Sequence, residues 1–439
     1  MTDLTTLIAE YQQRSLPTLT SRDTPLPRIA GMADVVVGVR RCGKTWRLYQ
    51  EMQRLRDEES VPADHILYLN LEDDRLQPAD VTLLQEALET FYRMAPAARE
   101  QESFLFFDEV QAVPGWSRFL RRVLDTERAR VYASGSSAKL LSREVSTEFR
   151  GRGHAVEVLP FSFAEAVRHG GVTVPDSLPG AELRSRLEAL YRRYLDVGGF
   201  PAVQELDEPT RVQTLQDYVE LVLLRDIIER HHISNVVAAR WFVRAVLQSS
   251  SRLLSVNRTY GALRSQGIEV GKDTLYALLG HLEDAFLAFP VVRFSASLRT
   301  REAGPRKIYC VDPGLAWAVA HISTLDVGLR LENAVYLELR RRSAGSREGS
   351  ISRYVTRGGH EVDFVVGVPE ELAAAQLIQV CADVTASDTR EREIRAVAEA
   401  MAELRLSTAL IVTLHDREQI EVPAGTIEVV PAWQWSLGL

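Results

Sequence analysis

Residues Gly38 to Thr45 form a glycine-rich loop that ends in a lysine and a threonine, with the sequence Gly-Val-Arg-Arg-Cys-Gly-Lys-Thr. In such a loop, glycines let backbone N–H groups approach phosphate oxygens, the lysine neutralises phosphate charge and the threonine hydroxyl binds Mg²⁺. The pattern predicts a site for ATP and Mg²⁺, with a chance glycine-rich turn as the alternative. The predicted nucleotide-binding residues are Gly38, Arg41, Cys42, Gly43, Lys44 and Thr45. Lys44 is also a predicted catalytic residue, and Thr45 is a predicted metal ligand.

Two adjacent carboxylates, Asp108 and Glu109, follow a run of four apolar residues at 104–107. A buried strand that ends in paired carboxylates suits metal-dependent hydrolysis, because one carboxylate can hold Mg²⁺ while its neighbour polarises the attacking water. We predict that Asp108 binds the nucleotide-bound metal and that Glu109 is catalytic. A solvated pair of charges at a strand end is the alternative.

Two further short segments carry groups that could act on a phosphate. Ser134-Gly135-Ser136-Ser137 follows the apolar stretch 130–133, and Ser136 is predicted to contact the γ-phosphate or the attacking water, unless the segment is an ordinary turn. Arg150 and Arg152 lie on either side of a glycine, where an arginine could reach the γ-phosphate of a neighbouring subunit. On the residues alone, a basic surface turn explains the two arginines equally well.

Five stretches are predicted to be the strands that position these groups. They cover residues 34–37, 65–71, 104–107, 130–133 and 154–159. A helix is predicted over 46–55, directly after the glycine-rich loop, so strand, loop and helix follow one another in the order that phosphate binding at a helix amino terminus requires. The sequence therefore predicts an α/β domain with the reactive groups at strand ends.

Taken together, these motifs resemble the AAA+ ATPases, and in particular the bacterial and archaeal subgroup that is fused to a carboxy-terminal domain of long-unknown function. The stretches that carry the resemblance are 38–45, 106–109, 134–137, 151–152, 159–165, 198–201 and 224–227. The resemblance implies ATP hydrolysis and a ring-like, hexameric homo-oligomer with composite sites. It also implies that Arg152, in preference to Arg150, acts on the neighbouring subunit.

A basic segment interrupts an otherwise acidic chain. The chain has a net charge of −8, and residues 240–307 hold eleven basic and five acidic residues. This segment therefore carries +6 and the remainder carries −14. A concentration of positive charge on an acidic chain indicates one anionic partner with a defined footprint.

The basic segment has the helix pattern of a winged helix. Helices are predicted to about Leu247, over 258–265 and over 272–286, and apolar residues and a basic loop at 299–307 follow them. In this fold the third helix would enter a DNA major groove and the wing would touch phosphates. The predicted DNA contacts are Lys272 and Tyr276 on the helix, and Arg299, Arg301, Arg306 and Lys307 in the wing. A winged helix that only packs subunits together is the alternative.

The carboxy-terminal region resembles the restriction-endonuclease-like, PD-(D/E)xK fold. Glu332, Asp363 and Gln379 fall where that fold places its metal-binding and catalytic groups. A competent site needs a lysine two residues beyond the last acid, and here glutamine replaces that acid and the chain holds no lysine after Lys307. We therefore predict an inactive nuclease fold that is kept for binding or assembly. Glu361 and Asp363 could also be a solvent-facing pair.

With 439 residues the chain is long enough for several domains. The predicted division is a P-loop AAA+ ATPase domain at 1–165, a helical lid or connector at 166–235, a winged-helix domain at 236–312 and a nuclease-like domain at 313–439. No apolar run reaches the roughly 18 residues that span a bilayer. The three cysteines are too few and too scattered for a disulfide framework. A cytoplasmic protein without a membrane partner is expected.

These features predict Mg²⁺-dependent ATP hydrolysis that drives an oligomeric motor on structured or duplex DNA, such as a DNA translocase or a remodeller of branched DNA by branch migration. Two other functions stay open. The first is a nucleotide-controlled signalling or defence switch that acts through protein partners. The second is an ATP-gated nuclease, which the missing lysine disfavours.

Overall fold

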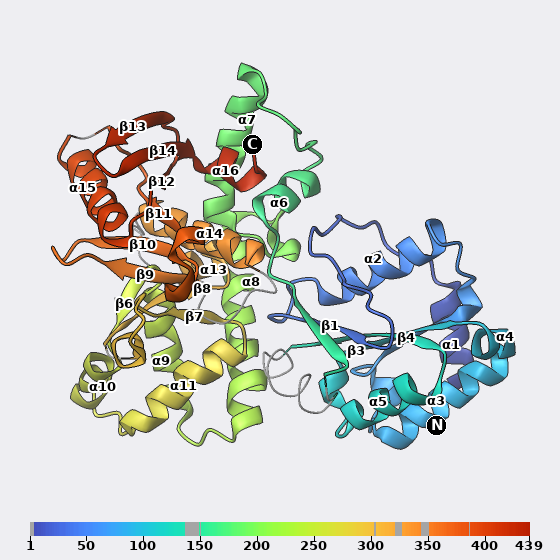
Figure 1. Cartoon of the computed structure of the whole chain (residues 1–439). Coiled ribbons are helices and arrows are strands. Elements are labelled where there is room, and N and C mark those ends of the chain that lie inside the picture. The colour runs from blue at the N-terminus through green and yellow to red at the C-terminus, as the bar shows by residue number, and fades with distance from the viewer. Residues whose placement is uncertain are drawn as a thin grey trace. The chain divides into compact units, whose positions relative to one another are not determined.

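The computed structural model describes residues 4–136, 149, 151–302, 304–320, 327–343, 351–385 and 387–439. The chain folds into two compact units, Met1–Leu159 and Pro160–Leu439 (Figure 1), and each is described by itself. The first unit holds most of the predicted ATPase domain. The predicted connector, winged helix and nuclease-like domain all lie in the second unit.

The first unit is built on a five-stranded sheet in the order β2-β3-β4-β1-β5, in which all neighbouring strands are parallel. The strands are β1 (Ala33–Val37), β2 (Ile66–Asn70), β3 (Ser103–Asp108), β4 (Ala129–Gly135) and β5 (Gly153–Glu157). The helices are α1 (Leu4–Gln13), α2 (Lys44–Asp57), α3 (Val81–Met94), α4 (Pro96–Glu100) and α5 (Trp116–Thr126). Short 3-10 turns lie at Ala63–His65, Asp74–Leu76 and Val110–Ala112. All five predicted strands are present, with ends shifted by one or two residues.

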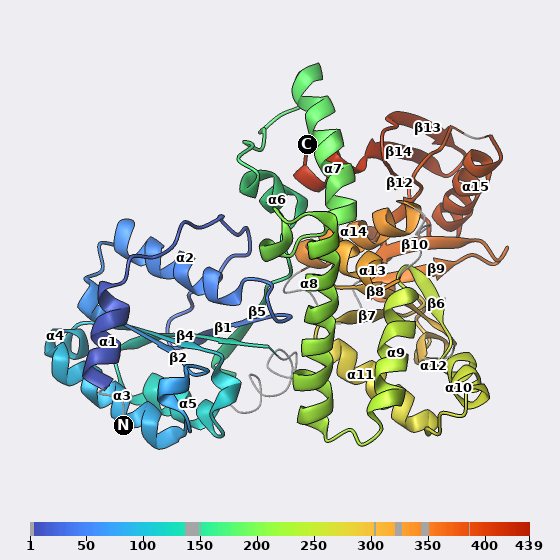
Figure 2. The same cartoon turned by 180° about the vertical axis from the view of Figure 1, so that it is seen from behind.

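Helices cover both faces of this sheet, with α2 on one face and α3 and α5 on the other (Figures 1 and 2). Every residue of β1 and β3 is consequently buried, as is usual for parallel sheets, whose strands read as continuous apolar runs. Because the strands are parallel, their carboxyl ends meet at one edge of the sheet. The glycine-rich loop, Asp108 and the end of β4 are therefore brought to the same edge.

The second unit begins with helices and continues with a small antiparallel sheet in the order β6-β8-β7. Its first elements are α6 (Phe163–His169), α7 (Ala181–Val197), a 3-10 turn at Pro201–Val203, α8 (Glu208–Leu221), a π-helical segment (Val222–Glu229) and α9 (Val236–Gln248). Next come β6 (Arg252–Leu254), α10 (Val256–Ser265), α11 (Lys272–Asp284), β7 (Ala288–Val291), α12 (Leu298–Glu302), β8 (Arg306–Cys310) and α13 (Pro313–Ala320). The prediction of a basic loop over 299–307 is wrong in part, because this stretch contains the short helix α12 and the first residues of β8.

A six-stranded mixed sheet forms the rest of the second unit, in the order β13-β14-β12-β11-β10-β9. Its elements are α14 (Val327–Arg342), β9 (Ile351–Val355), β10 (Glu361–Val366), a 3-10 segment at Pro369–Ala374, β11 (Gln376–Val380), α15 (Ser387–Leu404), β12 (Thr408–Thr413), β13 (Glu418–Val422), β14 (Gly425–Pro431) and α16 (Ala432–Leu437). Adjacent residues of β10 face opposite sides, as the two-residue period of a strand requires. Phe364 contacts Tyr336 of α14, whereas Val365 lies in a core cluster with Met401 of α15.

The two sheets of the second unit are joined across the predicted domain boundary at residue 312. The backbone N–H of Phe294 donates to the carbonyl of Arg353 in β9 at 2.7 Å, and Arg353 N–H donates to the carbonyl of Val292 at 3.0 Å. The Phe294 side chain is part of the same core cluster as the mixed sheet. The residues just after β7 are thus packed with the carboxy-terminal part of the chain.

Candidate functional site

The glycine-rich loop leaves β1 at Gly38 and enters α2 at Lys44. Gly38 has no room for a side chain, because a Cβ there would lie 2.1 Å from the carbonyl oxygen of Val158. Arg41 and Gly43 both have positive φ angles, 69° and 106°. Backbone in this conformation turns successive N–H groups inward and forms an anion-binding nest, here at the amino terminus of a 14-residue helix. The loop therefore fits a nucleotide phosphate.

Lys44 is buried beneath this loop. Its ammonium donates hydrogen bonds to the carbonyl oxygens of Gly38 (3.3 Å) and Val39 (3.4 Å), and it lies 3.6 Å from the Glu109 carboxylate. Burial acts to lower the pKa of Lys44, but the nearby charge of Glu109 outweighs it, and the pKa is raised above its usual value. The ammonium is therefore charged and available to phosphate oxygens.

Asp108 is the best-connected side chain at this edge of the sheet. Its Oδ2 accepts hydrogen bonds from Thr45 Oγ1 (2.7 Å) and from the Tyr68 hydroxyl (2.9 Å), and its Oδ1 accepts one from the Ser134 hydroxyl. Burial first, and then the charge of Glu109, raises the pKa of Asp108. Oxygen ligands are those that Mg²⁺ prefers, so the paired Thr45 hydroxyl and Asp108 carboxylate fit a magnesium ion between them and a nucleotide.

Glu109 is held in one orientation by its neighbours. It has a left-handed backbone conformation, with φ 55°, and its N–H donates to Ser134 Oγ at 3.0 Å. Gln111 donates from Nε2 to the Glu109 carboxylate at 2.6 Å. Burial acts to raise the pKa of Glu109, but the ammonium of Lys44 outweighs it and the pKa is lowered. An ionised, oriented carboxylate suits a group that accepts a proton from water.

The remaining predicted residues of the first unit have different surroundings. Ser136 is buried, and its hydroxyl lies 3.5 Å from Gln111 Nε2, next to Glu109. Arg152 is half exposed and forms an ion pair with Asp125 of its own chain. Arg150 and Ser137 lie outside the described residues. The structure thus places Ser136 beside the carboxylate pair, and the trans role of either arginine stays a prediction.

Tyr68 and Gln111 are two residues of this site that the sequence motifs missed. Tyr68 lies in β2, and its buried hydroxyl links Asp108 to Tyr49 of α2, which donates to it at 3.3 Å. Burial is the main cause that raises the pKa of Tyr68, so the phenol stays protonated. A polar side chain inside the apolar run Ile-Leu-Tyr-Leu was a visible signal, because a buried hydroxyl needs a partner.

The predicted nuclease residues meet in the second unit around a side chain that was predicted to contact DNA. The Lys307 ammonium lies 2.7 Å from Glu332, 2.8 Å from Asp363 and 3.1 Å from Glu361. Gln379 accepts a hydrogen bond from the backbone N–H of Asp363 at 3.1 Å. Lys307 is 6% exposed, so the DNA contact predicted for it is wrong.

The predicted nuclease-like region holds no lysine of its own, yet a lysine from outside it lies among its carboxylates. Lys307 precedes that region in the sequence, but the β8 strand delivers its ammonium to the carboxylates. Burial and the neighbouring Asp363 raise the pKa of Glu332 to about 8. In the described parts of the chain no three His, Cys, Asp or Glu side chains form a metal site.

The other predicted DNA-binding residues lie at or near the protein surface. Lys272 and Tyr276 are exposed on α11, and the Lys272 ammonium lies 5.2 Å from the centre of the Tyr260 ring of α10. Arg299 is exposed on α12, whereas Arg301 and Arg306 are half-buried. Arg306 pairs with Glu302 at 2.8 Å. Lys272, Tyr276 and Arg299 are thus the exposed members of this predicted set.

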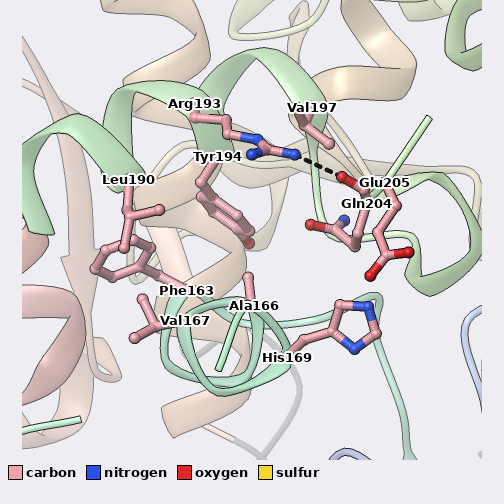
Figure 3. Close-up of a pocket in the computed structure, with 11 residues that line it drawn as sticks. Phe163, Ala166, Val167, His169, Leu190, Arg193, Tyr194, Val197, Gln204 and Glu205 are labelled. Atoms are coloured by element: carbon pink, nitrogen blue, oxygen red, sulfur yellow. Dashed lines mark hydrogen bonds between the residues drawn. The ribbon is translucent and has the colours of Figure 1, made fainter. Parts of the chain in front are cut away.

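A cavity of about 220 Å³ lies between α6 and α7 (Figure 3). Phe163 and Leu190 supply apolar walls, and Arg193 donates to the carbonyl of Gln204 at 2.6 Å beside it. None of the predicted catalytic or nucleotide-binding residues lines this cavity.

Among the described residues, no helix combines the length and the apolar character that crossing a membrane requires.

Two family models match parts of this chain. Residues 31–167 match the model of the AAA domain, and residues 188–326 match a domain of unknown function, DUF8612. The second match covers most of the predicted connector and winged helix. The phosphate loop and the carboxylate pair lie within the first match.

Relatives and solved structures extend over most of the chain. An uncharacterized protein of Methanocaldococcus jannaschii is 31% identical over 424 residues, which cover 95% of this chain and 91% of the relative. An uncharacterized protein of Haemophilus influenzae is 27% identical over 344 residues, 78% of this chain and 81% of the relative. A Walker-type ATPase of Pyrococcus abyssi aligns at 15% identity with a TM-score of 0.39, over 70% of this chain and 99% of that one. The chain belongs to the family of AAA-domain proteins that includes the Methanocaldococcus jannaschii relative.

Proposed function

We propose that this chain is a Mg²⁺-dependent ATPase that uses hydrolysis to act on DNA as an oligomeric motor or a remodeller of branched DNA. The observation that carries the ATPase part is the meeting of Lys44, Thr45, Asp108 and Glu109 at one edge of a parallel sheet. A bound Mg²⁺ would neutralise charge that develops on the phosphates. Thr45 and Asp108 are the residues that would hold it.

Three groups of the chain would carry out the remaining steps. Lys44 would bind the outer phosphates from beneath the loop. Glu109 would orient the attacking water and take its proton, since its carboxylate is ionised and accepts a hydrogen bond from Gln111, while Ser134 holds its backbone N–H. Ser136, next to Gln111, would sense the γ-phosphate.

The oligomeric part of the proposal depends on the arginines near β5. Arg152 is half exposed, and among the described residues it forms an ion pair with Asp125. The γ-phosphate of a nucleotide bound to a neighbouring subunit could take the place of Asp125. A ring-like, hexameric assembly would bring such an arginine to each site. Light scattering of the purified chain with and without a slowly hydrolysed ATP analogue tests whether the nucleotide produces this assembly.

The DNA part of the proposal depends on the basic surface of the second unit. We interpret helices α9, α10 and α11 with the β6-β8-β7 sheet as a winged helix. Lys272 and Tyr276 would then lie on the helix that approaches DNA. The mixed sheet is interpreted as a nuclease-like fold without activity, because its carboxylates are engaged with Lys307.

The test is the steady-state ATPase rate of the wild type and of Glu109→Gln, without DNA and with duplex, single-stranded or four-way-junction DNA. We expect at least one DNA form to raise the wild-type rate several-fold, and Glu109→Gln to abolish the rate in all conditions. Glu102→Gln makes the same substitution just before the opposite end of β3 and is the matched control. It should keep the wild-type rate.

Other results would favour the competing functions. An ATPase rate that no DNA form changes, combined with nucleotide-dependent assembly, would support a switch that acts through protein partners. The pairing of Arg306 with Glu302 favours this alternative to a limited extent, because it removes free charge from the wing. A normal rate in Glu109→Gln would contradict the catalytic assignment itself.

A further inference from the structure

The environment of Lys307 is the most unusual feature of the second unit. Three carboxylate oxygens, from Glu332, Glu361 and Asp363, lie between 2.7 and 3.1 Å from its single ammonium nitrogen. Lys307, Glu332 and Asp363 are all less than 10% exposed. Buried lysines are rare unless they are paired, and this one has more carboxylates around it than its charge requires.

The cluster is assembled from elements that are distant in the sequence. Lys307 lies in β8, Glu332 in α14, and Glu361 and Asp363 in β10. Antiparallel pairing with β6 and β7 fixes the position of β8, and the preceding residues 292–294 are bonded to β9, the neighbour of β10. The lysine is therefore brought to the carboxylates by the fold.

Additional hydrogen bonds hold the carboxylates in place. The Tyr309 hydroxyl donates to Glu332 at 2.6 Å, and the backbone N–H of Val380 donates to the second oxygen of Asp363 at 3.0 Å. Arg353 lies 3.6 Å from Glu361. Each carboxylate is thus oriented toward the central cation by contacts that do not involve Lys307.

The three carboxylates around Lys307 require a positive charge at the point between them. Several carboxylate oxygens that converge on one point are the usual surroundings of a divalent cation. A lone ammonium supplies one positive charge at the same place without a diffusible ion. Burial acts to lower the pKa of Lys307, but Asp363 and Glu332 outweigh it and the pKa is raised, so the ammonium stays charged.

We propose that Lys307 is a built-in cation: its ammonium fills the point on which the Glu332, Glu361 and Asp363 carboxylates converge and closes this cluster to metal, in keeping with the absence of a metal-holding group of three such side chains among the described residues. The mixed sheet consequently binds no metal at this cluster and cannot use one to cleave a phosphodiester. The inference does not rest on the ATPase proposal, since the cluster lies wholly within the second unit and needs no nucleotide.

The inference predicts that removal of the ammonium creates a metal site. In the full-length chain, Lys307→Ala leaves the three carboxylates around the position that the ammonium occupied. Titration with Mn²⁺, followed by electron paramagnetic resonance in the absence of nucleotide, should show an additional site in Lys307→Ala that the wild type lacks. The double variant Lys307→Ala/Asp363→Asn should lose this site. Ethylammonium, which resembles the deleted end of the side chain, should compete with Mn²⁺ for it.

Controls distinguish this effect from a general change in charge. Lys272→Ala removes a lysine from the surface and should leave Mn²⁺ binding as in the wild type. Lys307→Arg keeps the cation and should gain no site. Should Lys307→Ala fail to fold, the wild type and Asp363→Asn carry the test, and equal Mn²⁺ binding by the two supports the inference. An Asp363-dependent Mn²⁺ site in the wild type, or a folded Lys307→Ala that gains no site, would overturn it.

Discussion

At the scale of single residues, Asp108 shows how a buried carboxylate is kept ready for a metal ion. Three hydroxyl groups, from Thr45, Tyr68 and Ser134, donate to its two oxygens. Each hydroxyl comes from a different element, namely α2, β2 and β4. Only Thr45 belongs to the phosphate loop, whereas the hydroxyls of Tyr68 and Ser134 orient the Asp108 carboxylate from the neighbouring strands β2 and β4. We therefore regard Tyr68 as a positioning residue.

Tyr68→Phe tests this positioning role. The variant removes one hydrogen bond to the Asp108 carboxylate, and a hydrogen bond to a charged group contributes about 1.5 kcal/mol or more, which is roughly tenfold. We expect the Mg²⁺ concentration for half-maximal ATPase activity to rise by roughly that factor, with little loss of thermal stability. Tyr132→Phe is the matched control, because the Tyr132 hydroxyl is buried and has no hydrogen-bond partner among the described residues. Equal Mg²⁺ requirements in the two variants would contradict the assignment.

At the scale of elements, the two glycines at 198–199 connect α7 to the helices that follow. A Cβ at Gly198 would lie 2.0 Å from the Asp312 carboxylate. That carboxylate accepts hydrogen bonds from the N–H of Gly199 (2.5 Å) and of Leu315 (2.8 Å). Burial raises the pKa of Asp312 to about 6. The end of α7 and the start of α13 therefore approach each other closely at this glycine pair.

Gly198→Ala should destabilise the second unit more than an ordinary glycine substitution does. The backbone of Gly198, with φ 78° and ψ −168°, lies in a region that is essentially restricted to glycine and costs an alanine about 1–3 kcal/mol, and the clash with Asp312 should add about 1–3 kcal/mol. Gly267 also has a positive φ, 73°, with no atom near its Cβ position, so Gly267→Ala measures the effect of an alanine at a positive φ without a clash. Thermal melting followed by circular dichroism compares the two. Similar melting temperatures for the two variants would show that the Asp312 side chain moves away from an alanine at position 198 without cost.

Elements were more predictable from the sequence than the contacts between them. The five strands of the first unit are short apolar or β-branched runs flanked by turn residues, so their ends were placed to within two residues. The stretch 299–307 was predicted to be a basic loop, whereas it contains most of α12 and the first residues of β8. Lys307 could not be assigned to its carboxylates, because Asp363 lies 56 positions away and only the packing of two sheets brings them together. Tyr68 was visible as a polar residue in a strand, but its partner was not.

At the scale of the whole molecule, charge is distributed unevenly, with a +6 segment on a chain of net charge −8. DNA binding through this segment should weaken with salt, because each neutralised phosphate releases counterions. We expect Lys272→Ala to reduce the slope of log affinity against log salt by roughly one. Arg417→Ala removes an exposed charge on the mixed sheet and should leave the slope unchanged. Fluorescence anisotropy with labelled duplex measures both, and an unaltered slope in Lys272→Ala would exclude this lysine from the interface.

The strand order of the first unit has a consequence for how the protein is made. β1 lies between β4 and β5, and Ala33 is aligned with Val131 on one side and Gly153 on the other. A chain that is emerging from the ribosome therefore exposes both edges of β1 until β4 has been made, and one edge until β5 has been made. Pairing between such distant segments is slow, and open strand edges attract other chains. The strand that leads into the phosphate loop is thus a part of the nascent protein that needs protection from aggregation.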